Sequence, residues 1–355
     1  MTNGTVRFPL SSALRRERKT DAVPLVNGEW RDKPPAADEI KGGAFHRLES
    51  PFRDWITPDG SPGPDGKSAS AAEPGRYELY IAYSCPWASR TLAVRALKGL
   101  EDAIAVHAAE PFMGSEGWHY AQEQNGGATG PFHNHHRLYT ATDAAFTGKA
   151  TVPVLWDRAE GRIVNNESAD IVRILNDGFI GIAGNDLDLY PEALRPEIDR
   201  WNDRIYPALN NGVYRAGFAT AQHAYDEAVR DVFEALDEID AHLAAHRYLA
   251  GEWLTEADIR LFVTLIRFDI AYYGAFKCNL RYIDEYAALP GYLREIYQWP
   301  GIAGTVNLDH IKRGYYGIRT VNPTQIVPIG PEIDIDGPPG RDALSGKGVA
   351  TRTLT

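Results

Sequence analysis

Apolar and polar positions follow two different periods along the chain, and the change of period divides the chain in two. Up to about residue 180, short apolar runs alternate with helical patterns. Helices are expected from Pro86 and from Ser168, and strands are expected over residues 77–82, 104–108, 151–156 and 162–164. The order β-α-β, a polar insertion over residues 111–150 and then β-β-α predicts a small α/β domain with a mixed sheet.

After residue 190 the spacing of apolar residues is helical. One uninterrupted stripe steps by three and four residues through Tyr225, Val229, Val232, Leu236, Ile239 and Leu243. A second helix is expected to begin at Thr255, whose oxygen can bind the Asp258 amide while the Asp258 carboxylate reaches back in a capping box. The segment that follows is apolar on most sides, which predicts the buried centre of an all-helical domain.

Stretches without apolar periodicity mark the expected domain boundaries. Polar residues 1–44 predict an N-terminal arm. The α/β domain is expected over residues 45–185 and the all-helical domain over residues 186–320. Residues 321–355 are expected to form a C-terminal extension that ends in a mobile tail from Gly337.

Composition limits the classes of function. The 355 residues carry a net charge of −11, which disfavours nucleic-acid binding because that binding needs Lys and Arg to neutralise phosphates. No apolar run approaches the ~18 residues of a membrane-spanning helix, and the N-terminus has no secretory signal. Two cysteines are too few for a secreted disulfide scaffold. We therefore expect a cytoplasmic protein with free thiols and neither a membrane nor a nucleic-acid partner.

Cys85 is the strongest candidate for chemistry. It lies between a predicted strand and a helix that begins at Pro86, so free helix amides and the positive end of the helix dipole are expected to lower its pKa. A strand, Cys-Pro and a helix in this order are typical of redox-active thioredoxin-like domains. Three residues on stands Ala88 rather than a second cysteine, so an external thiol is expected to resolve any sulfur intermediate. An inert buried cysteine is the alternative.

Two further segments can complete a thiol-binding site. Thr151-Val152-Pro153 has the form of the cis-proline loop that faces the cysteine in thioredoxin-like folds, and a trans proline at a strand edge is the alternative. Ser168 is expected to cap a helix, so that its hydroxyl and the free amides bind an α-carboxylate while Glu167 binds the ammonium of the same amino acid. A plain capped helix is the alternative there.

The remaining polar clusters are expected to be structural. No metal site is expected, because an apparent loop without carboxylate or cysteine ligands holds the histidines His133, His135 and His136. Arg260 and Arg267 lie seven residues apart on a buried helix, where ion pairs with acids such as Asp269 or Asp258 are the expected role. Cys278 is expected to be structural.

The chain resembles the xi class of glutathione transferases, the glutathionyl-hydroquinone reductases, from about Phe45 to Pro331. The motifs that carry the resemblance are, in order, YIAYSCPWASRT, TVPVLWD, IVNNESADIVRILN, NNGVYRAGFA, LTEADIRLFVTLIRFD, FKCN, IKRGYY and NPTQIVPIGP. Their order and spacing together, rather than any single motif, argue against coincidence. The resemblance implies a thioredoxin-like N-terminal domain, an all-helical glutathione-transferase C-terminal domain and a homodimer.

The same resemblance implies an activity and its residues. Cys85 is the implied nucleophile, which takes glutathione from a glutathionyl-hydroquinone as a mixed disulfide. A second glutathione then releases oxidised glutathione, so glutathione is a co-substrate and no metal is implied. The implied glutathione contacts are Trp118, Arg137, Val152, Glu167 and Ser168. Phenols that can bind the ring oxygens and stack on the hydroquinone are implied for Tyr214, Tyr315 and Tyr316.

Two departures from the family pattern keep alternatives open. Ser89 stands where a histidine is common, and it cannot supply positive charge beside the thiolate. The segment between Trp118 and Arg137 also differs, so another small thiol, such as mycothiol or γ-glutamylcysteine, is an alternative partner. A general thiol transferase that reduces mixed disulfides or dehydroascorbate is the alternative enzyme. A conjugating transferase and a non-enzymatic binding protein are weaker alternatives, and an unperturbed Cys85 pKa would favour the latter.

Overall fold

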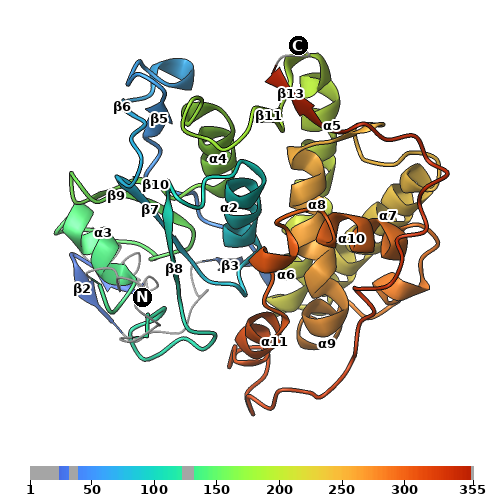
Figure 1. Ribbon diagram of the computed structural model, residues 1–355. Helices are drawn as coiled ribbons and strands as arrows, with labels where there is room; N and C mark the ends of the chain where they lie inside the picture. The colour runs from blue at the N-terminus through green and yellow to red at the C-terminus, as the bar shows by residue number, and fades with distance from the viewer. Residues whose placement is uncertain (1–23, 32–38, 122–131, 353–355) are drawn as a thin grey trace, which may run out of the picture.

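The computed structural model describes residues 24–31, 39–121 and 132–352. Figure 1 shows a sheet-containing half, coloured blue to green, beside a half built mainly of helices, coloured yellow to red. Within the described residues, every helix is too short or too polar to cross a lipid bilayer. The predicted fold class, an α/β domain followed by an all-helical domain, is confirmed.

A four-stranded mixed sheet forms the centre of the first half. Its order is β10-β9-β7-β8, and its strands are β7 (Tyr77–Ile81), β8 (Ala105–Ala108), β9 (Val154–Asp157) and β10 (Arg162–Asn165). β7 and β8 run parallel, whereas β9 pairs antiparallel with both β7 and β10. Each predicted strand is observed with small shifts at its ends, and all five residues of the central strand β7 are buried.

Helix α2 (Pro86–Leu97) connects β7 to β8 and lies between the sheet and the helical half (Figure 1). It packs against α4 (Ser168–Arg173) and against α8 (Glu256–Arg267). Pro86 occupies the first turn, where its missing N–H removes no helical hydrogen bond. The residues at the start of α2 therefore lie where the two halves of the molecule meet.

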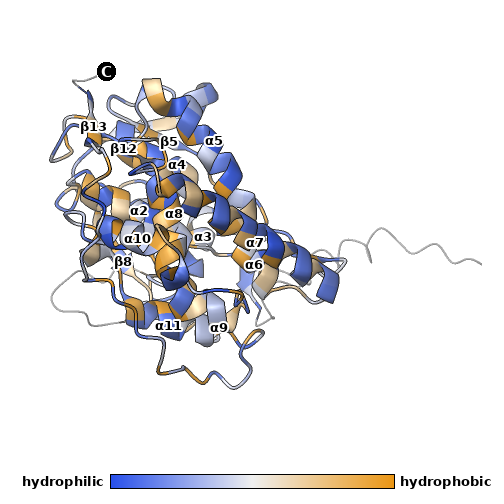
Figure 2. Cartoon of the chain, turned by 90° about the vertical axis from the view of Figure 1, so that its right-hand side faces the viewer, coloured by the Kyte–Doolittle hydropathy of each residue, from blue (hydrophilic) through white to orange (hydrophobic). Residues whose placement is uncertain are grey.

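Helix α8 is the buried centre of the second half, since all of its residues are buried. The predicted capping box is confirmed: the Thr255 amide donates to the Asp258 carboxylate at 2.9 Å. Helix α7 (Gln222–Leu243) follows the predicted apolar stripe and buries it from Val229 to Leu243, whereas Tyr225 is half-buried. Figure 2 shows hydrophilic and hydrophobic residues alternating along α7, as an amphipathic helix at a surface requires.

Shorter helical segments complete the structure. They are η1 (Pro64–Gly66), α3 (His136–Thr142), η2 (Ile174–Gly178), η3 (Glu192–Leu194), α5 (Arg195–Ile205), η4 (Tyr206–Asn210), α6 (Gly212–Gly217), η5 (Phe268–Tyr272), α9 (Tyr273–Ala275), η6 (Ile283–Glu285), α10 (Leu289–Tyr297), η7 (Ala303–Thr305) and α11 (Leu308–Tyr316). The segments η2, η4 and η5 are π-helical turns that continue α4, α5 and α8.

The described part of the predicted arm is folded against both halves: Leu25 binds the α/β half, and the Gly43 carbonyl accepts the Thr220 amide of the helical half at 3.0 Å. Three small sheets pair β1 (Leu25–Val26) with β2 (Glu29–Trp30), β3 (Ile40–Lys41) with β4 (Ala44–Phe45), and β5 (Trp55–Thr57) with β6 (Ala69–Ala71). Leu25 is fully buried, and its amide donates to the Gly148 carbonyl at 3.2 Å. Residues 1–23 and 32–38 of the predicted arm lie outside the described residues.

The expectation of a mobile tail from Gly337 is wrong for the described residues. Strand β13 (Gly348–Thr351) pairs antiparallel with β11 (Leu187–Asp188) and parallel with β12 (Trp253–Leu254). Arg341 is buried and donates to the carbonyls of Leu243, His246 and Arg247. Polar, glycine-rich composition indicates mobility only when no distant segment offers partners, and here two strands far away in the sequence offer them.

Candidate active site

Cys85 lies at the N-terminus of α2, directly after the turn that leaves β7. It is the N-cap residue of the helix and has extended backbone dihedrals. Its Sγ donates to the Val152 carbonyl oxygen at 3.5 Å, and the Val152–Pro153 peptide bond is cis. The predicted juxtaposition of the cysteine with a cis-proline loop is therefore confirmed.

The ionisation of the Cys85 thiol differs from the prediction. Desolvation by burial raises its pKa, whereas hydrogen bonds from the helix amides and the cations Arg267 and Arg47 lower it. The helix terminus thus acts in the predicted direction, but burial outweighs it, so the expected net lowering of the pKa is wrong for this thiol. The reason is that the sequence reveals the helix terminus but not the protein atoms that remove the sulfur from water.

The loop opposite Cys85 is held by side chains from α3 and from the segment before it. The Thr151 carbonyl accepts hydrogen bonds from the Tyr139 hydroxyl and from His135 Nε2, both at 2.8 Å. The Thr151 amide donates to the same Tyr139 hydroxyl at 3.0 Å. No described residue accepts a hydrogen bond from the Val152 amide. The Val152 carbonyl thus faces the cysteine, and the Val152 amide is left to pair with an extended thiol ligand.

His135→Gln is expected to flatten the pH dependence of stability between about pH 6.5 and pH 4. Burial lowers the pKa of His135 to about 4, so the unfolded chain binds a proton at higher pH than the folded chain does. The stability that neutral His135 contributes is complete above pH 6.5 and is lost as the pH falls, by about 3 kcal/mol in total. Urea unfolding at three pH values measures this loss, and an equal slope in wild type and variant would contradict it.

The segment predicted to bind an amino acid lies at the start of α4, but its capping residue is different from the prediction. Glu167, not Ser168, is the N-cap of α4, and its carboxylate accepts the Ala169 amide at 3.1 Å. Ser168 is the first helical residue, and its hydroxyl donates to Glu167 at 3.5 Å. The Ser50 hydroxyl donates to the other Glu167 oxygen at 3.0 Å. A carboxylate is thus held at a helix N-terminus, where a free amino acid with both charges can bind.

Trp118 and Arg137 lie on either side of residues 122–131, which are outside the described residues. The Trp118 carbonyl accepts the His135 amide at 2.9 Å, so the segment with Trp118 is joined to the start of α3. Arg137 is the second residue of α3 and is exposed. Glutathione contacts of these two residues remain predictions.

Of the three histidines predicted in a loop, His133 and His135 precede helix α3 in irregular structure, as predicted, whereas His136 lies in the helix. His136 is the first residue of α3, where its Nε2 lies 2.9 Å from Glu116 and its ring stacks on Trp30. His135 Nδ1 lies 2.6 Å from the Tyr120 hydroxyl. Throughout residues 24–31, 39–121 and 132–352, no group of three or more His, Cys, Asp or Glu side chains could hold a metal ion.

Hydroxyls of tyrosines from three helical segments meet at one point. Those of Tyr214 in α6 and Tyr315 in α11 lie 2.6 Å apart, and that of Tyr272 in η5 lies 3.0 Å from Tyr315. Burial, followed by the nearby Cys85 thiol, raises the pKa of Tyr214 to about 12, while Arg47 lowers it. The pair predicted as part of the hydroquinone pocket is therefore assembled near the cysteine, with both phenols protonated at neutral pH.

Tyr316 is placed differently from its neighbour. Its hydroxyl abuts Gly274, so closely that a Cβ at position 274 would collide with it. It makes no hydrogen bond to the phenols of Tyr214, Tyr315 or Tyr272. The structure therefore brings two of the three predicted tyrosines together and adds Tyr272, which the resemblance did not indicate.

Arg47 is a further charged residue of the site that sequence reasoning missed. Its guanidinium lies 4.7 Å from the Trp87 ring and 4.8 Å from the Tyr214 ring, and its Nε donates to Asn211 Oδ1 at 3.1 Å. Its Nη2 is buried without a hydrogen-bond partner. Arg47 comes from an aperiodic segment far from Cys85 in the chain, so no local signal could have identified it.

The predicted ion pairs of α8 are also different. Arg260 pairs with Glu256, one turn earlier, at 2.9 Å. Among the described residues, no carboxylate lies within ion-pair distance of Arg267. The carboxylates expected as partners are used elsewhere: Asp258 binds the Leu249 amide, and Asp269 accepts the amide of a residue in η6.

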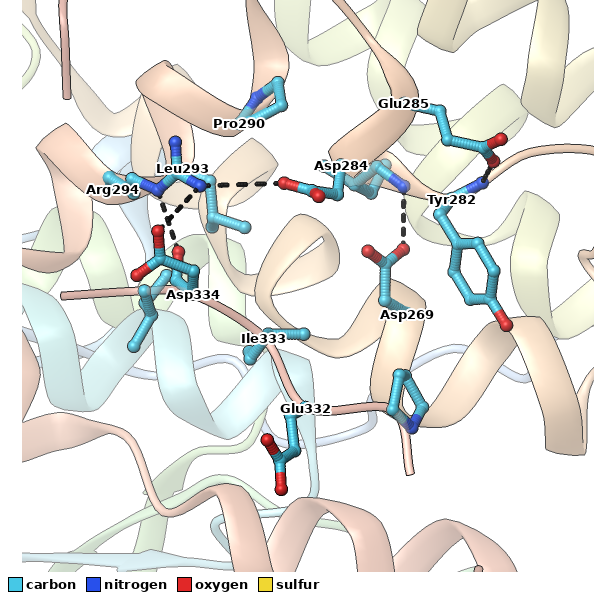
Figure 3. A pocket seen from close by; sticks show the side chains of 13 residues that line it. Asp269, Tyr282, Asp284, Glu285, Pro290, Leu293, Arg294, Glu332, Ile333 and Asp334 are labelled. Atoms are coloured by element: carbon cyan, nitrogen blue, oxygen red, sulfur yellow. Dashed lines mark hydrogen bonds and ion pairs between the residues drawn. The ribbon is translucent and has the colours of Figure 1, made fainter. Parts of the chain in front are cut away.

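A separate cavity with acidic walls lies between η6, α10 and the C-terminal extension (Figure 3). Its carboxylates are those of Asp269, Asp284, Glu285, Glu332 and Asp334. Arg294 pairs with two of them, Asp334 at 3.2 Å and Asp284 at 3.6 Å. None of the residues predicted to bind glutathione or the hydroquinone lines this cavity.

Comparison with known proteins agrees with the geometry. The chain matches the family "Glutathione S-transferase, N-terminal domain" over residues 84–177 and "Glutathione S-transferase, C-terminal domain" over residues 222–295. It is 49% identical to glutathionyl-hydroquinone reductase YqjG of Escherichia coli, over 91% of this chain and 99% of that protein. It is 45% identical to glutathionyl-hydroquinone reductase PcpF of Sphingobium chlorophenolicum, over 88% and 97%.

Solved structures give the same assignment. A xi class glutathione transferase from Natrialba magadii superposes with a TM-score of 0.82 at 44% identity, covering 92% of this chain and 98% of that one. The glutathione-bound structure of Escherichia coli YqjG superposes with a TM-score of 0.80 at 47% identity, covering 90% and 98%. With its cysteine, its cis-proline loop and these relatives, the chain belongs to the xi class of the glutathione transferase family.

Proposed function

We propose that this protein is a glutathione-dependent reductase that removes the thiol from glutathionyl-hydroquinones and releases hydroquinone and oxidised glutathione. The observation that carries the proposal is the position of Cys85, which faces the cis Val152–Pro153 bond while lying near the hydrogen-bonded pair Tyr214–Tyr315. Cys85 therefore lies next to both a thiol-binding loop and an aromatic site lined by phenols, and it can act as the nucleophile for a substrate that occupies both. The names of the relatives, two glutathionyl-hydroquinone reductases, support the same activity.

In the proposed first step, the Cys85 thiolate attacks the glutathione sulfur and the bond between sulfur and ring carbon breaks. Carbon is a poor leaving group unless the ring carbon is first protonated, so the keto tautomer of the ring reacts. The electron pair of the broken bond then moves through the ring to the carbonyl oxygen, which becomes a phenolate. Protonated Tyr214 and Tyr315 can donate hydrogen bonds to this developing charge, which lowers the barrier.

In the proposed second step, a second glutathione thiolate attacks the glutathione sulfur of the mixed disulfide. The bond to the Cys85 sulfur breaks, so that oxidised glutathione forms and the Cys85 thiolate is regenerated. The overall reaction consumes one glutathionyl-hydroquinone and one glutathione and yields one hydroquinone and one oxidised glutathione. The resolving thiol has to come from outside because residue 88 is alanine and Cys278 is fully buried in the helical half.

Glutathione is proposed to bind along the loop and the start of α4. Val152 pairs with its backbone, and Glu167 and Ser168 bind the amino-acid end of its γ-glutamyl group. Trp118 and Arg137 are carried as proposed contacts from the resemblance. A homodimer, a cytoplasmic location, and domains with the boundaries 45–185 and 186–320 are likewise proposals.

The test is incubation of the full-length protein with a glutathionyl-hydroquinone and excess glutathione, with both products separated by chromatography. We expect hydroquinone and oxidised glutathione in equal amounts. If hydroquinone does not appear but a glutathione mixed disulfide on another protein is reduced, the protein is a general thiol transferase. If only mycothiol or γ-glutamylcysteine supports turnover, the chemistry is retained and the thiol is different.

A further inference from the structure

Arg267, the last residue of α8, reaches out of the helical half to the turn that carries Cys85. Its Nη2 donates to the Tyr83 carbonyl at 2.7 Å and its Nε to the Ser84 carbonyl at 3.0 Å. The same Nη2 donates to the Ser89 hydroxyl at 2.5 Å. Tyr83 and Ser84 directly precede the cysteine, and Ser89 lies in the first turn of α2. One guanidinium therefore binds the chain on both sides of the nucleophile.

The charge of Arg267 is buried without a counter-charge. The side chain is 1% exposed, and its fourth hydrogen bond goes to the Val263 carbonyl at 2.6 Å. Within the part of the chain that the structure describes, no carboxylate pairs with it. Burying an arginine costs free energy that neutral acceptors offset only in part, so a site for an anion next to it is favoured.

The thiolate form of Cys85 is the anion that this charge can stabilise, because it opposes the effect of burial on the thiol. The positive charge of Arg267 lowers the pKa of the Cys85 thiol. It also lowers the pKa values of the phenols of Tyr214, Tyr272 and Tyr315, so it acts on both the thiol and the aromatic part of the proposed site. Three other charged or titratable side chains also act electrostatically on the thiol. They are Arg47 before β5, Arg90 in α2 and Tyr214 in α6.

We propose that Arg267 is the positioning residue that holds the Cys85 turn and supplies the positive charge that stabilises the thiolate. In this arrangement the helical half, rather than a basic residue at position 89, activates the nucleophile of the α/β half. Ser89 contributes a hydroxyl that accepts from Arg267 instead of a charge of its own. The inference rests on the proposed nucleophilic role of Cys85 and does not depend on which aromatic substrate is used.

The charge of Arg267 can be separated from its hydrogen bonds with two variants of the full-length protein. Arg267→Gln keeps two donors and removes the charge, whereas Arg267→Lys keeps the charge and loses donors. Alkylation of Cys85 by iodoacetamide is followed by mass spectrometry as a function of pH, without any substrate, and circular dichroism verifies the fold. Arg260→Lys is the matched control, because Arg260 is a buried arginine of the same helix that already pairs with Glu256.

We expect Arg267→Gln to raise the alkylation pKa of Cys85 by about one unit or more, which slows alkylation at neutral pH about tenfold. Arg267→Lys and Arg260→Lys are expected to stay close to wild type. An unchanged profile in Arg267→Gln, or an equal rise in Arg267→Lys, would overturn the proposal. If Arg267→Gln does not fold, a rise of the alkylation pKa in Arg267→Lys still overturns the proposal, since the proposal requires a nearly unchanged profile there. Failure of hydroquinone release with a shifted profile would reject the proposed function and leave this inference standing.

Discussion

Replacing Cys85 with serine is expected to reduce kcat/KM for hydroquinone release by at least about 10³-fold while leaving the fold intact. A serine hydroxyl stays protonated at neutral pH and cannot form a mixed disulfide. Cys85 is also the only sulfur among the described residues that contacts the cis-proline loop, since its Sγ reaches the Val152 carbonyl. Hydroquinone release under excess glutathione measures the loss, and mass spectrometry should detect a glutathione adduct on the wild type and none on Cys85→Ser.

The matched control is Cys278→Ser, which removes the other thiol of the chain. Cys278 is fully buried, and burial raises its pKa, so it is neither accessible nor ionised at neutral pH. Turnover per folded molecule should therefore stay near the wild-type value. The assignment of the nucleophile would be disproved if Cys85→Ser kept a tenth of the wild-type turnover. It would also be disproved if Cys278→Ser no longer formed the glutathione adduct.

Tyr214→Phe is expected to reduce hydroquinone release by about 10²-fold, the usual effect of removing one donor to a developing oxyanion. Tyr214 is partly exposed, whereas its partner Tyr315 is buried, so Tyr214 is the member of the pair that we expect to contact the substrate ring. Its pKa of about 12 keeps it a hydrogen-bond donor throughout the working range of pH. Reduction of a small glutathione mixed disulfide needs no such donor and should stay unchanged.

Two more variants sharpen this result. Tyr225→Phe is the matched control, since it removes a partly buried hydroxyl that binds only the Lys277 carbonyl. Tyr316→Phe tests the third predicted phenol, and its effect should be smaller than that of Tyr214→Phe because its hydroxyl abuts Gly274 rather than the other phenols. If Tyr214→Phe lost hydroquinone release and mixed-disulfide reduction to the same extent, Tyr214 would belong to the thiol site, and its aromatic-binding role would be contradicted.

Local patterns along the chain were sufficient for the elements whose stabilising contacts are local. The Cys-Pro junction placed Cys85 at a helix N-terminus, and the stripe from Tyr225 to Leu243 became α7. The Thr255–Asp258 capping box closes within one helical turn, so its residues specify it by themselves. The Val152–Pro153 loop was recognisable because proline is the residue that makes a cis bond accessible.

The tertiary structure alone decided features that depend on residues far apart in the chain. The N-cap of α4 is Glu167, because its carboxylate accepts the Ala169 amide in the folded chain. By residue type alone, the neighbouring Ser168 is an equally good cap. The C-terminal residues became ordered because β11 and β12 offered unpaired edges, which composition does not reveal. The ionisation of Cys85 depended on burial by both halves of the molecule, and this outweighed the helix terminus that the sequence shows.

Within the candidate site, Arg267 shows the same difference between what local sequence determines and what tertiary structure determines. The sequence determined that a buried helix would carry it, and charge pairing with a nearby acid was the simplest expectation. In the folded chain, Arg267 binds Ser89 and the carbonyls before Cys85, which stand almost two hundred residues earlier. Apolar periodicity and capping motifs specify which segments form helices and strands, because those contacts lie within a few residues. The partner of a buried charge is specified only by packing, because it depends on which distant surfaces close over it.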